Sequence, residues 1–140
     1  MKKLQILAVA VCFASPVLAE GDVENGEAQF NRQCVACHVV RDENGDVLAG
    51  RGARAGPNLY GLAGSVVGSV EGYRYGDSII EAGQAGATWN EESFVAYVRN
   101  PTDWLRNTLD DRRARSKMGY KMRSDAEAAD IFAYLATFGE

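Results

Sequence analysis

Residues 34–38 are Cys34-Val35-Ala36-Cys37-His38 and contain the only histidine of the 140-residue chain. The C-x-x-C-H spacing is typical of covalent haem attachment. On a helical turn, residues three and four positions apart lie on one face. Two thiols with this spacing can therefore reach the two vinyl groups at one edge of a porphyrin. The imidazole is then placed to bind iron through Nε2, while its Nδ1–H needs an acceptor, usually a backbone carbonyl.

Three other interpretations of the two cysteines explain less of the motif. A thioredoxin-like C-x-x-C follows a strand in an α/β pattern, and the sequence shows neither feature. A zinc site needs four ligands, whereas two cysteines and one histidine supply three. A disulfide within the motif would give His38 no role. The motif therefore predicts one haem c, bound by thioethers of Cys34 and Cys37, with His38 as an axial iron ligand.

The first 19 residues have the pattern of a secretory signal peptide. The start MKK is basic, residues 4–14 form an apolar run of 11 residues, and the sequence VLA ending at Ala19 is a cleavage pattern. The apolar run is too short to span a bilayer, although a retained anchor is the alternative. We expect residues 1–19 to be removed with Cys12, leaving one domain of residues 20–140 in the periplasm.

Composition and charge exclude several classes of protein. Charged residues make up 24% of the chain and hydrophobic residues 46%, which is typical of a globular protein rather than a disordered one. Removal of Lys2 and Lys3 leaves 13 of the 15 basic side chains against 19 acidic ones, a net charge of −6. Nucleic-acid binding is therefore not expected, because it calls for a basic face.

Capping and hydrophobic spacing predict helices at both ends of the domain. The first helix spans about Asp22 to Gln33, with Asp22 as N-cap. Its Gly26 lies on the apolar face and would let another helix cross closely. The last helix begins at a capping box formed by Ser124 and Glu127, continues through an apolar stripe and can end at Gly139.

The middle of the domain shows one further clear helix and a long irregular stretch. The helix spans about Trp89 to Asn100 and opens with a capping box of Thr88 and Glu91, and a short helix near residues 102–109 is possible. Residues 41–86 are rich in Gly, Ser, Val and Tyr and show no long strand alternation. So long a loop is unusual in a compact domain, so we expect a large flat cofactor to fill the middle.

Counting the remaining side chains leaves methionine as the second axial ligand. No second histidine exists, and no cysteine remains for a thiolate once Cys12 is removed. His/Met ligation is a known haem arrangement that raises the reduction potential. The candidates are Met118 and Met122, which both lie in SKMGYKM. Core filling is the commoner use of methionine, and position alone does not choose between the two.

Six segments in one order make the chain resemble a class I cytochrome c. The resemblance is to the longer bacterial periplasmic kind, the cytochrome c-two or c-550 type, which is related to mitochondrial cytochrome c. The segments are GDVENGEAQF, CVACHVV, AGPNLYGL, EGYRYGDSII, TWNEESFVAYVRNP and SKMGYKM. The resemblance implies an all-α fold of three to five helices wrapped around one haem c. The terminal helices would cross, with Gly26 and Phe30 against Ile131 and Tyr134.

The same resemblance implies roles for individual cofactor-binding residues. Met118 would supply the sulfur ligand, and the carbonyl of Pro57 would accept the hydrogen bond from the histidine ligand. Tyr75 and Trp89 would hydrogen-bond a buried propionate, and Tyr97 would lie near the methionine sulfur. The alternative for the three aromatic residues is a purely structural place in the core.

Two strong axial ligands leave no coordination position for a substrate, which suits electron transfer rather than catalysis. The resemblance implies a soluble, monomeric periplasmic one-electron carrier and not an enzyme or a membrane-embedded protein. The donor would be a membrane-bound cytochrome bc-type complex, a quinol–cytochrome c oxidoreductase. The acceptor would be a photosynthetic reaction centre, a cytochrome oxidase or a periplasmic reductase of denitrification. Alternatives are a haem protein with an open sixth site for a gas or peroxide and a fixed subunit of a complex.

Charge is distributed unevenly along the chain. Residues 106–123 contain seven basic and two acidic side chains, whereas residues 20–50 contain seven acidic and two basic ones. A basic surface near Met118 is expected to steer an acidic partner during approach. The alternative is a solvated loop that only needs charge.

Overall fold

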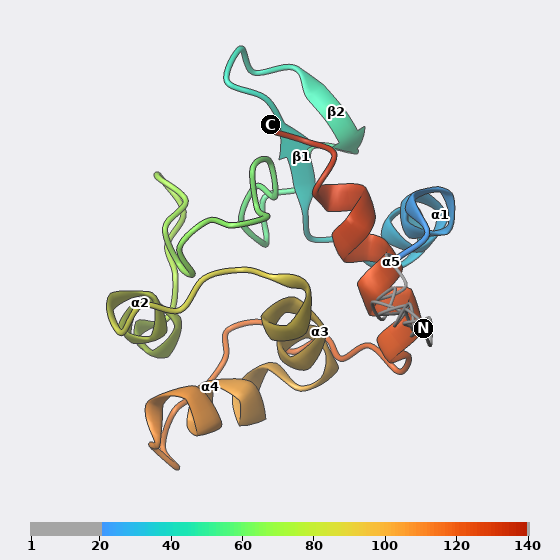
Figure 1. Cartoon of the computed structure of the whole chain (residues 1–140). Coiled ribbons are helices and arrows are strands. Elements are labelled where there is room, and N and C mark those ends of the chain that lie inside the picture. Colours follow the sequence, from blue (N-terminus) through green and yellow to red (C-terminus); the bar gives the residue numbers. More distant parts are fainter. Residues whose placement is uncertain (1–20, 140) are drawn as a thin grey trace, which may run out of the picture.

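The computed structural model describes residues 21–139, which form five helices and a two-stranded sheet (Figure 1). The helices are α1 (Val23–Gln33), α2 (Asp77–Gln84), α3 (Glu91–Arg99), α4 (Pro101–Leu109) and α5 (Asp125–Leu135), and the strands are β1 (Val39–Arg41) and β2 (Val47–Gly50). The predicted all-α fold is confirmed, with a small sheet added. The predicted signal peptide, residues 1–19, lies outside the described residues.

Helices α1 and α5, the first and last helices of the chain, pack side by side (Figure 1). Asp22 caps α1 as predicted, because its side chain accepts a hydrogen bond from the amide of Asn25 at 2.9 Å. A Cβ atom on Gly26 would lie 2.0 Å from the carbonyl oxygen of Asp130, so the missing side chain is what permits the contact. The rings of Phe30 and Tyr134 have centroids 5.7 Å apart, and the expected close packing of the terminal helices is confirmed.

The start of α5 has only half of the predicted capping box. The Ser124 hydroxyl accepts from the amide of Glu127 at 3.2 Å, as expected of an N-cap. The carboxylate of Glu127 instead accepts a hydrogen bond from Nε2 of Gln33 at 3.0 Å, which links α5 to α1. The helix ends at Leu135, and Gly139 follows after a turn with a φ of 88°.

The capping box predicted at Thr88 and Glu91 is wrong. Asn90 caps α3, accepting from the amide of Ser93 at 2.8 Å while the Ser93 hydroxyl accepts from the amide of Asn90 at 2.9 Å. Asn90, and not Thr88, is the N-cap because it stands directly before the first helical residue, where its short side chain reaches the amides of the first turn. The short helix expected near residues 102–109 is present as α4, with Pro101 in its first turn.

Residues 41–86 contain more regular structure than their composition indicated. Strands β1 and β2 form an antiparallel hairpin with a register shift between Val40 and Arg41, and α2 follows later in this stretch. Both features are short, with strands of three and four residues and a helix of eight. Elements of this length carry too few residues for a period of 2.0 or 3.6 to stand out.

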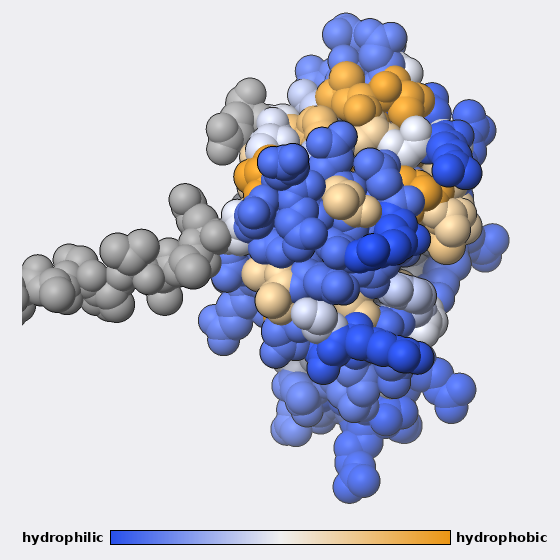
Figure 2. All heavy atoms as spheres, turned by 90° about the vertical axis from the view of Figure 1, so that its right-hand side faces the viewer, coloured by the Kyte–Doolittle hydropathy of each residue, from blue (hydrophilic) through white to orange (hydrophobic). Residues whose placement is uncertain are grey.

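The buried core lies between α1, α3 and α5 and continues to α4 through Leu105. Phe30, Leu105, Ile131 and Leu135 are fully buried. Among residues 21–139, no helix has both the length and the apolar character needed to cross a bilayer. The face that carries α1 and α5 is largely hydrophilic, with hydrophobic side chains gathered near the hairpin end, where Val47 and Leu48 are exposed (Figure 2).

Candidate haem-binding site

A cavity of about 770 Å³ opens in the middle of the molecule, bordered by the end of α1, by irregular loops and by α3. Its volume is in the range of about 300–1,000 Å³ that small-molecule and cofactor pockets occupy. The walls are mainly apolar and aromatic. Its polar and sulfur-containing side chains include those singled out from the sequence, namely Cys34, Cys37, His38, Tyr75, Trp89, Tyr97 and Met118, and Pro57 lines it as well.

The C-x-x-C-H motif forms a tight turn at the end of α1. The amides of Cys37 and His38 both donate to the carbonyl of Cys34, at 3.1 and 2.9 Å. This winding places the two cysteines and the histidine along one wall of the cavity. The structure therefore has the helical spacing that two thioether bonds to one porphyrin edge require.

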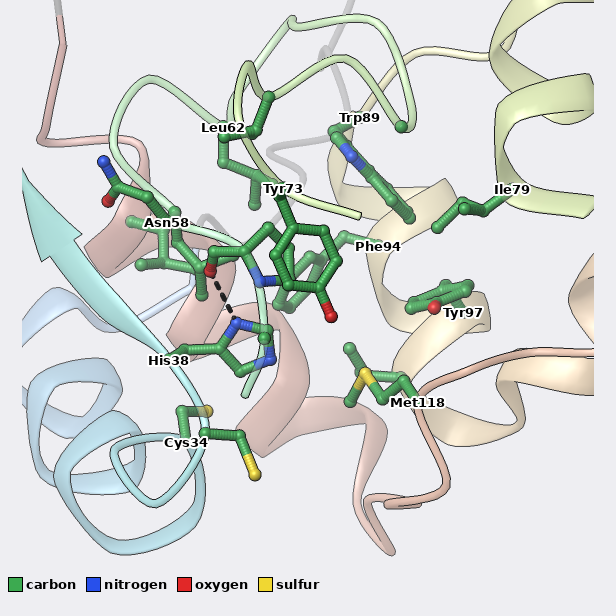
Figure 3. A pocket seen from close by; sticks show the side chains of 18 of the residues that line it. Cys34, His38, Asn58, Leu62, Tyr73, Ile79, Trp89, Phe94, Tyr97 and Met118 are labelled. Atoms are coloured by element: carbon green, nitrogen blue, oxygen red, sulfur yellow. Dashed lines mark hydrogen bonds between the residues drawn. The ribbon is translucent and has the colours of Figure 1, made fainter. Parts of the chain in front are cut away.

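The imidazole of His38 is oriented by the backbone. Its Nδ1 lies 2.9 Å from the carbonyl oxygen of Pro57 (Figure 3). Because a carbonyl only accepts, Nδ1 carries the proton, and Nε2 keeps a free lone pair for a metal. Burial lowers the pKa of His38, while the hydrogen bond to Pro57 acts in the opposite direction. The neutral form, which is the one that binds iron, is thus favoured.

Gly56 is a site residue that the sequence reasoning missed. A Cβ atom at this position would lie 2.4 Å from Cε1 and 2.6 Å from Nδ1 of His38. The imidazole therefore packs directly on the backbone, and the amide of Gly56 donates to the carbonyl of Cys37 at 2.7 Å. The available signal was the glycine immediately before Pro57 in AGPNL.

Both candidate methionines line the cavity, but their surroundings differ. Met118 belongs to the irregular segment before α5 and is partly buried, and its side chain enters the same space as His38 from another wall (Figure 3). Met122 is only 3% exposed and packs in the core, where its amide donates to the carbonyl of Val98 at 2.8 Å. Its environment is that of a core-filling residue.

Ser116 connects Tyr97 to Met118, a link that the sequence did not indicate. The hydroxyl groups of Tyr97 and Ser116 lie 3.1 Å apart, and the Ser116 oxygen also accepts from the amide of Met118 at 3.1 Å. Tyr97 therefore lies beside the Met118 segment, as Figure 3 shows. Burial raises the pKa of Tyr97, so its phenol stays protonated.

Tyr75 and Trp89 lie at the cavity wall, where the structure gives each a further contact. The hydroxyl oxygen of Tyr75 accepts from the amide of Val70 at 3.2 Å, and burial raises its pKa. Its proton is free to point at an acceptor in the cavity. The ring of Trp89 stacks on Trp104 with centroids 5.6 Å apart. Their bonds to a propionate stay predictions.

The side chains around the cavity fit a haem c. Two thiols at the required spacing, a neutral imidazole with its Nδ1–H already engaged, and a thioether on another wall surround a mainly apolar space. The imidazole rests on Gly56, where a side chain would displace it. A zinc site, a thioredoxin-like pair or a disulfide would each use only some of these side chains.

Comparison with known proteins finds similarity to cytochromes c. The family model described as "Cytochrome c" matches residues 23–139. Cytochrome c2 of Rhodovulum adriaticum is 53% identical over 119 residues, covering 85% of this chain and 94% of that protein. Cytochrome c-550 of Paracoccus denitrificans is 39% identical, with 96% and 87% covered. The crystal structure of cytochrome c2 from Rhodobacter sphaeroides superposes with a TM-score of 0.82 at 43% identity, covering 85% of this chain and 97% of that one.

Proposed function

The chain belongs to the cytochrome c family, and from this premise we propose that it is a soluble periplasmic carrier of single electrons. As in the family, one haem c is attached covalently. The relatives named cytochrome c2 and cytochrome c-550 support the carrier role. We propose no catalytic step for this protein.

The single observation that carries the proposal is the pairing of a pre-oriented imidazole with a thioether across one cavity. We propose that Cys34 and Cys37 form the thioethers and that His38 and Met118 are the axial ligands. When bound, the haem supplies a one-electron couple at its iron. The chain holds the Nδ1 proton of His38 on Pro57 and excludes water with apolar walls. Two strong ligands would leave no vacancy for a reactant.

We further propose that the protein shuttles between larger redox complexes. The donor would be a membrane-bound quinol–cytochrome c oxidoreductase, and the acceptor a reaction centre, a cytochrome oxidase or a periplasmic reductase. Export would follow cleavage of residues 1–19. The mass of the mature protein tests the last point, because cleavage after Ala19 leaves Glu20 as the first residue.

An optical spectrum of the oxidised protein tests the ligand assignment. Thioether ligation to ferric haem gives a weak long-wavelength band. We expect Met118→Leu to abolish this band and Met122→Leu to retain it, with both proteins folded. Loss of the band in the Met122 variant alone would overturn the assignment of Met118. Ready binding of carbon monoxide to the reduced wild-type protein would show an open site and overturn the carrier function itself.

Reconstitution with partner complexes tests the carrier role. The reduced form should be produced by a bacterial quinol–cytochrome c oxidoreductase and consumed by at least one of the three acceptor types, with second-order kinetics in each case. A stable complex with one partner that does not dissociate during turnover would contradict a shuttling role.

A further inference from the structure

The segment that carries Met118 is held almost entirely by side chains. Within the described part of the chain, residues 115–121 make no hydrogen bond from backbone to backbone and belong to no helix or strand. The neighbouring Met122 is fixed, because its amide bonds to Val98 and its side chain is buried. The position of Met118 therefore depends on the side-chain contacts that the neighbouring residues make with other parts of the chain.

Lys117 holds the part of this segment before Met118 through a hydrogen bond and a cation–π contact. Its Nζ atom donates to the carbonyl of Arg74 at 2.5 Å and lies 4.8 Å from the ring centroid of Tyr73. A cation over an aromatic face adds to the hydrogen bond. This contact ties the residue before Met118 to the loop at residues 70–76.

Tyr120 fastens the other side of Met118 to α1. Its hydroxyl donates to Oε1 of Gln33 at 2.8 Å, although the two residues are 87 positions apart. Residues on both sides of this bond line the cavity, so the bond joins two of its walls. Tyr120 itself is 48% exposed, so little packing adds to its hydrogen bond.

Gln33 is held in place by two further hydrogen bonds. Its Nε2 donates to Oε1 of Gln29 at 2.7 Å and to Oε2 of Glu127 at 3.0 Å. Gln29 is only 5% exposed, so one of the two acceptors that hold the Gln33 side chain is itself buried. The acceptor that meets Tyr120 is thus fixed by both terminal helices, and its side chain is already ordered when the bond forms.

We propose that Tyr120 and Gln33 are positioning residues that keep the Met118 sulfur in the cavity by closing its segment against α1. The proposal rests on the proposed function only in taking Met118 as an iron ligand. Opening of the segment must break the Tyr120–Gln33 bond while the rest of the fold stays intact. Losing the bond should therefore make Met118 leave its place more often.

Imidazole exchange in the oxidised holoprotein measures this opening. At saturating imidazole, the rate of replacement of Met118 becomes limited by opening of the segment. We expect Tyr120→Phe to raise this limiting rate about fivefold, which is the effect of losing one typical hydrogen bond. Gln33→Met should raise the rate at least as much, because it also removes the bonds of Gln33 to Gln29 and Glu127. The double variant should be no faster than Gln33→Met alone, because both changes remove the same bond. In Tyr120→Phe, the long-wavelength band and the midpoint of global unfolding should change little.

Tyr134→Phe is the control, since this tyrosine lies outside the cavity lining, packs its ring on Phe30 and Phe138, and has a hydroxyl without a hydrogen-bond partner among the described residues. Its limiting rate should equal that of the wild type. An unchanged rate in Tyr120→Phe, or additive effects in the double variant, would overturn the proposal while leaving the ligand assignment intact. Retention of the long-wavelength band in Met118→Leu would instead reject the assignment on which the proposal rests.

Discussion

At the scale of single residues, the histidine ligand depends on a neighbour without a side chain. The imidazole of His38 is clamped between the carbonyl of Pro57 and the backbone of Gly56. We predict that Gly56→Ala displaces the ring, because its Cβ atom would lie within 2.4 Å of Cε1. The free energy of unfolding of the holoprotein should fall by about 1–3 kcal/mol, as for other overpacked sites.

Denaturant titration and the His38 Nδ1–H proton resonance check this prediction together. The resonance should shift or disappear in Gly56→Ala. Gly76→Ala adds the same methyl group at another glycine of the cavity lining, where the nearest protein atom to the new Cβ would be Cβ of Lys117, at 3.8 Å, and the His38 ring should stay in place. Equal stability of the Gly56 variant and the wild type would show that the ring does not need this contact.

The buried phenol of Tyr97 should make the stability of the protein depend on pH in the alkaline range. Burial raises the pKa of Tyr97 in the folded protein above its ordinary value of 10.0. As the pH rises above 10, the unfolded chain loses this proton first, so the free energy of unfolding falls until the folded residue also ionises. Tyr97→Phe should make the loss of stability above pH 10 less steep. Denaturant midpoints at pH 9 and pH 11 measure this loss of stability in the wild type and in Tyr97→Phe. An equal loss in both proteins would contradict the prediction.

The residues that the sequence could indicate were those with distinctive chemistry. Cys34, Cys37 and His38 form a motif whose spacing has a mechanical reason, and they reach one wall of the cavity together. Gly56 and Ser116 were missed, because a glycine beside an imidazole and a serine beneath a backbone amide show their roles only once distant segments meet. Such contacts arise from tertiary structure and leave no local periodicity.

At the scale of secondary-structure elements, the crossing of α1 and α5 organises the fold. Gly26 costs about 1 kcal/mol of helix propensity relative to alanine. We predict that Gly26→Ala nevertheless lowers the free energy of unfolding by about 2 kcal/mol, because its Cβ atom would strike the backbone of Asp130. Backbone atoms cannot move aside as a flexible side chain can, so the helices must separate.

A mutation on the opposite face of α1 separates packing from propensity. Ala28 is exposed, so Ala28→Gly should cost only about 1 kcal/mol through propensity alone. Urea denaturation of both variants measures the difference. If Gly26→Ala were stabilising, propensity would outweigh packing and the close crossing would not matter for stability.

Elements with strong caps and long apolar faces were predictable, and short ones were not. Helices α1 and α5 have eleven residues each and side-chain N-caps that the sequence shows directly. Helix α2 has eight residues, and its N-cap, Gly76, makes no side-chain hydrogen bond. The β1–β2 hairpin is equally weak in sequence, because its register shift breaks the alternation that would mark a strand.

At the scale of the whole molecule, basic charge is concentrated in the stretch of chain that leads from α4 to Met118. Arg112, Arg113 and Arg115 are all exposed, in the irregular stretch between α4 and Met118. Arg113 approaches Asp111 at 3.5 Å, and exposed pairs of this kind contribute little. Within residues 21–139, Arg112 and Arg115 make no ion pair. Their field is therefore directed mainly to solvent and to approaching partners.

We predict that replacing Arg112, Arg113 and Arg115 together by glutamine slows association with an acidic redox partner. At low ionic strength the second-order rate constant should fall about tenfold, because steering by complementary charge raises association rates by at least this factor. The difference from the wild type should shrink towards physiological salt, where charges more than about 8 Å apart are largely screened. Stopped-flow oxidation at several salt concentrations measures both effects.

A variant with the same change in net charge decides whether position matters. Arg41, Arg51 and Arg54 lie in or after the β1–β2 hairpin, away in sequence from the Met118 segment. Replacing these three by glutamine should slow association much less, since steering depends on where the field is directed and not only on its sum. If both triple variants lose the same fraction of the rate, net charge alone acts, and the basic stretch is a solvated loop without a docking role.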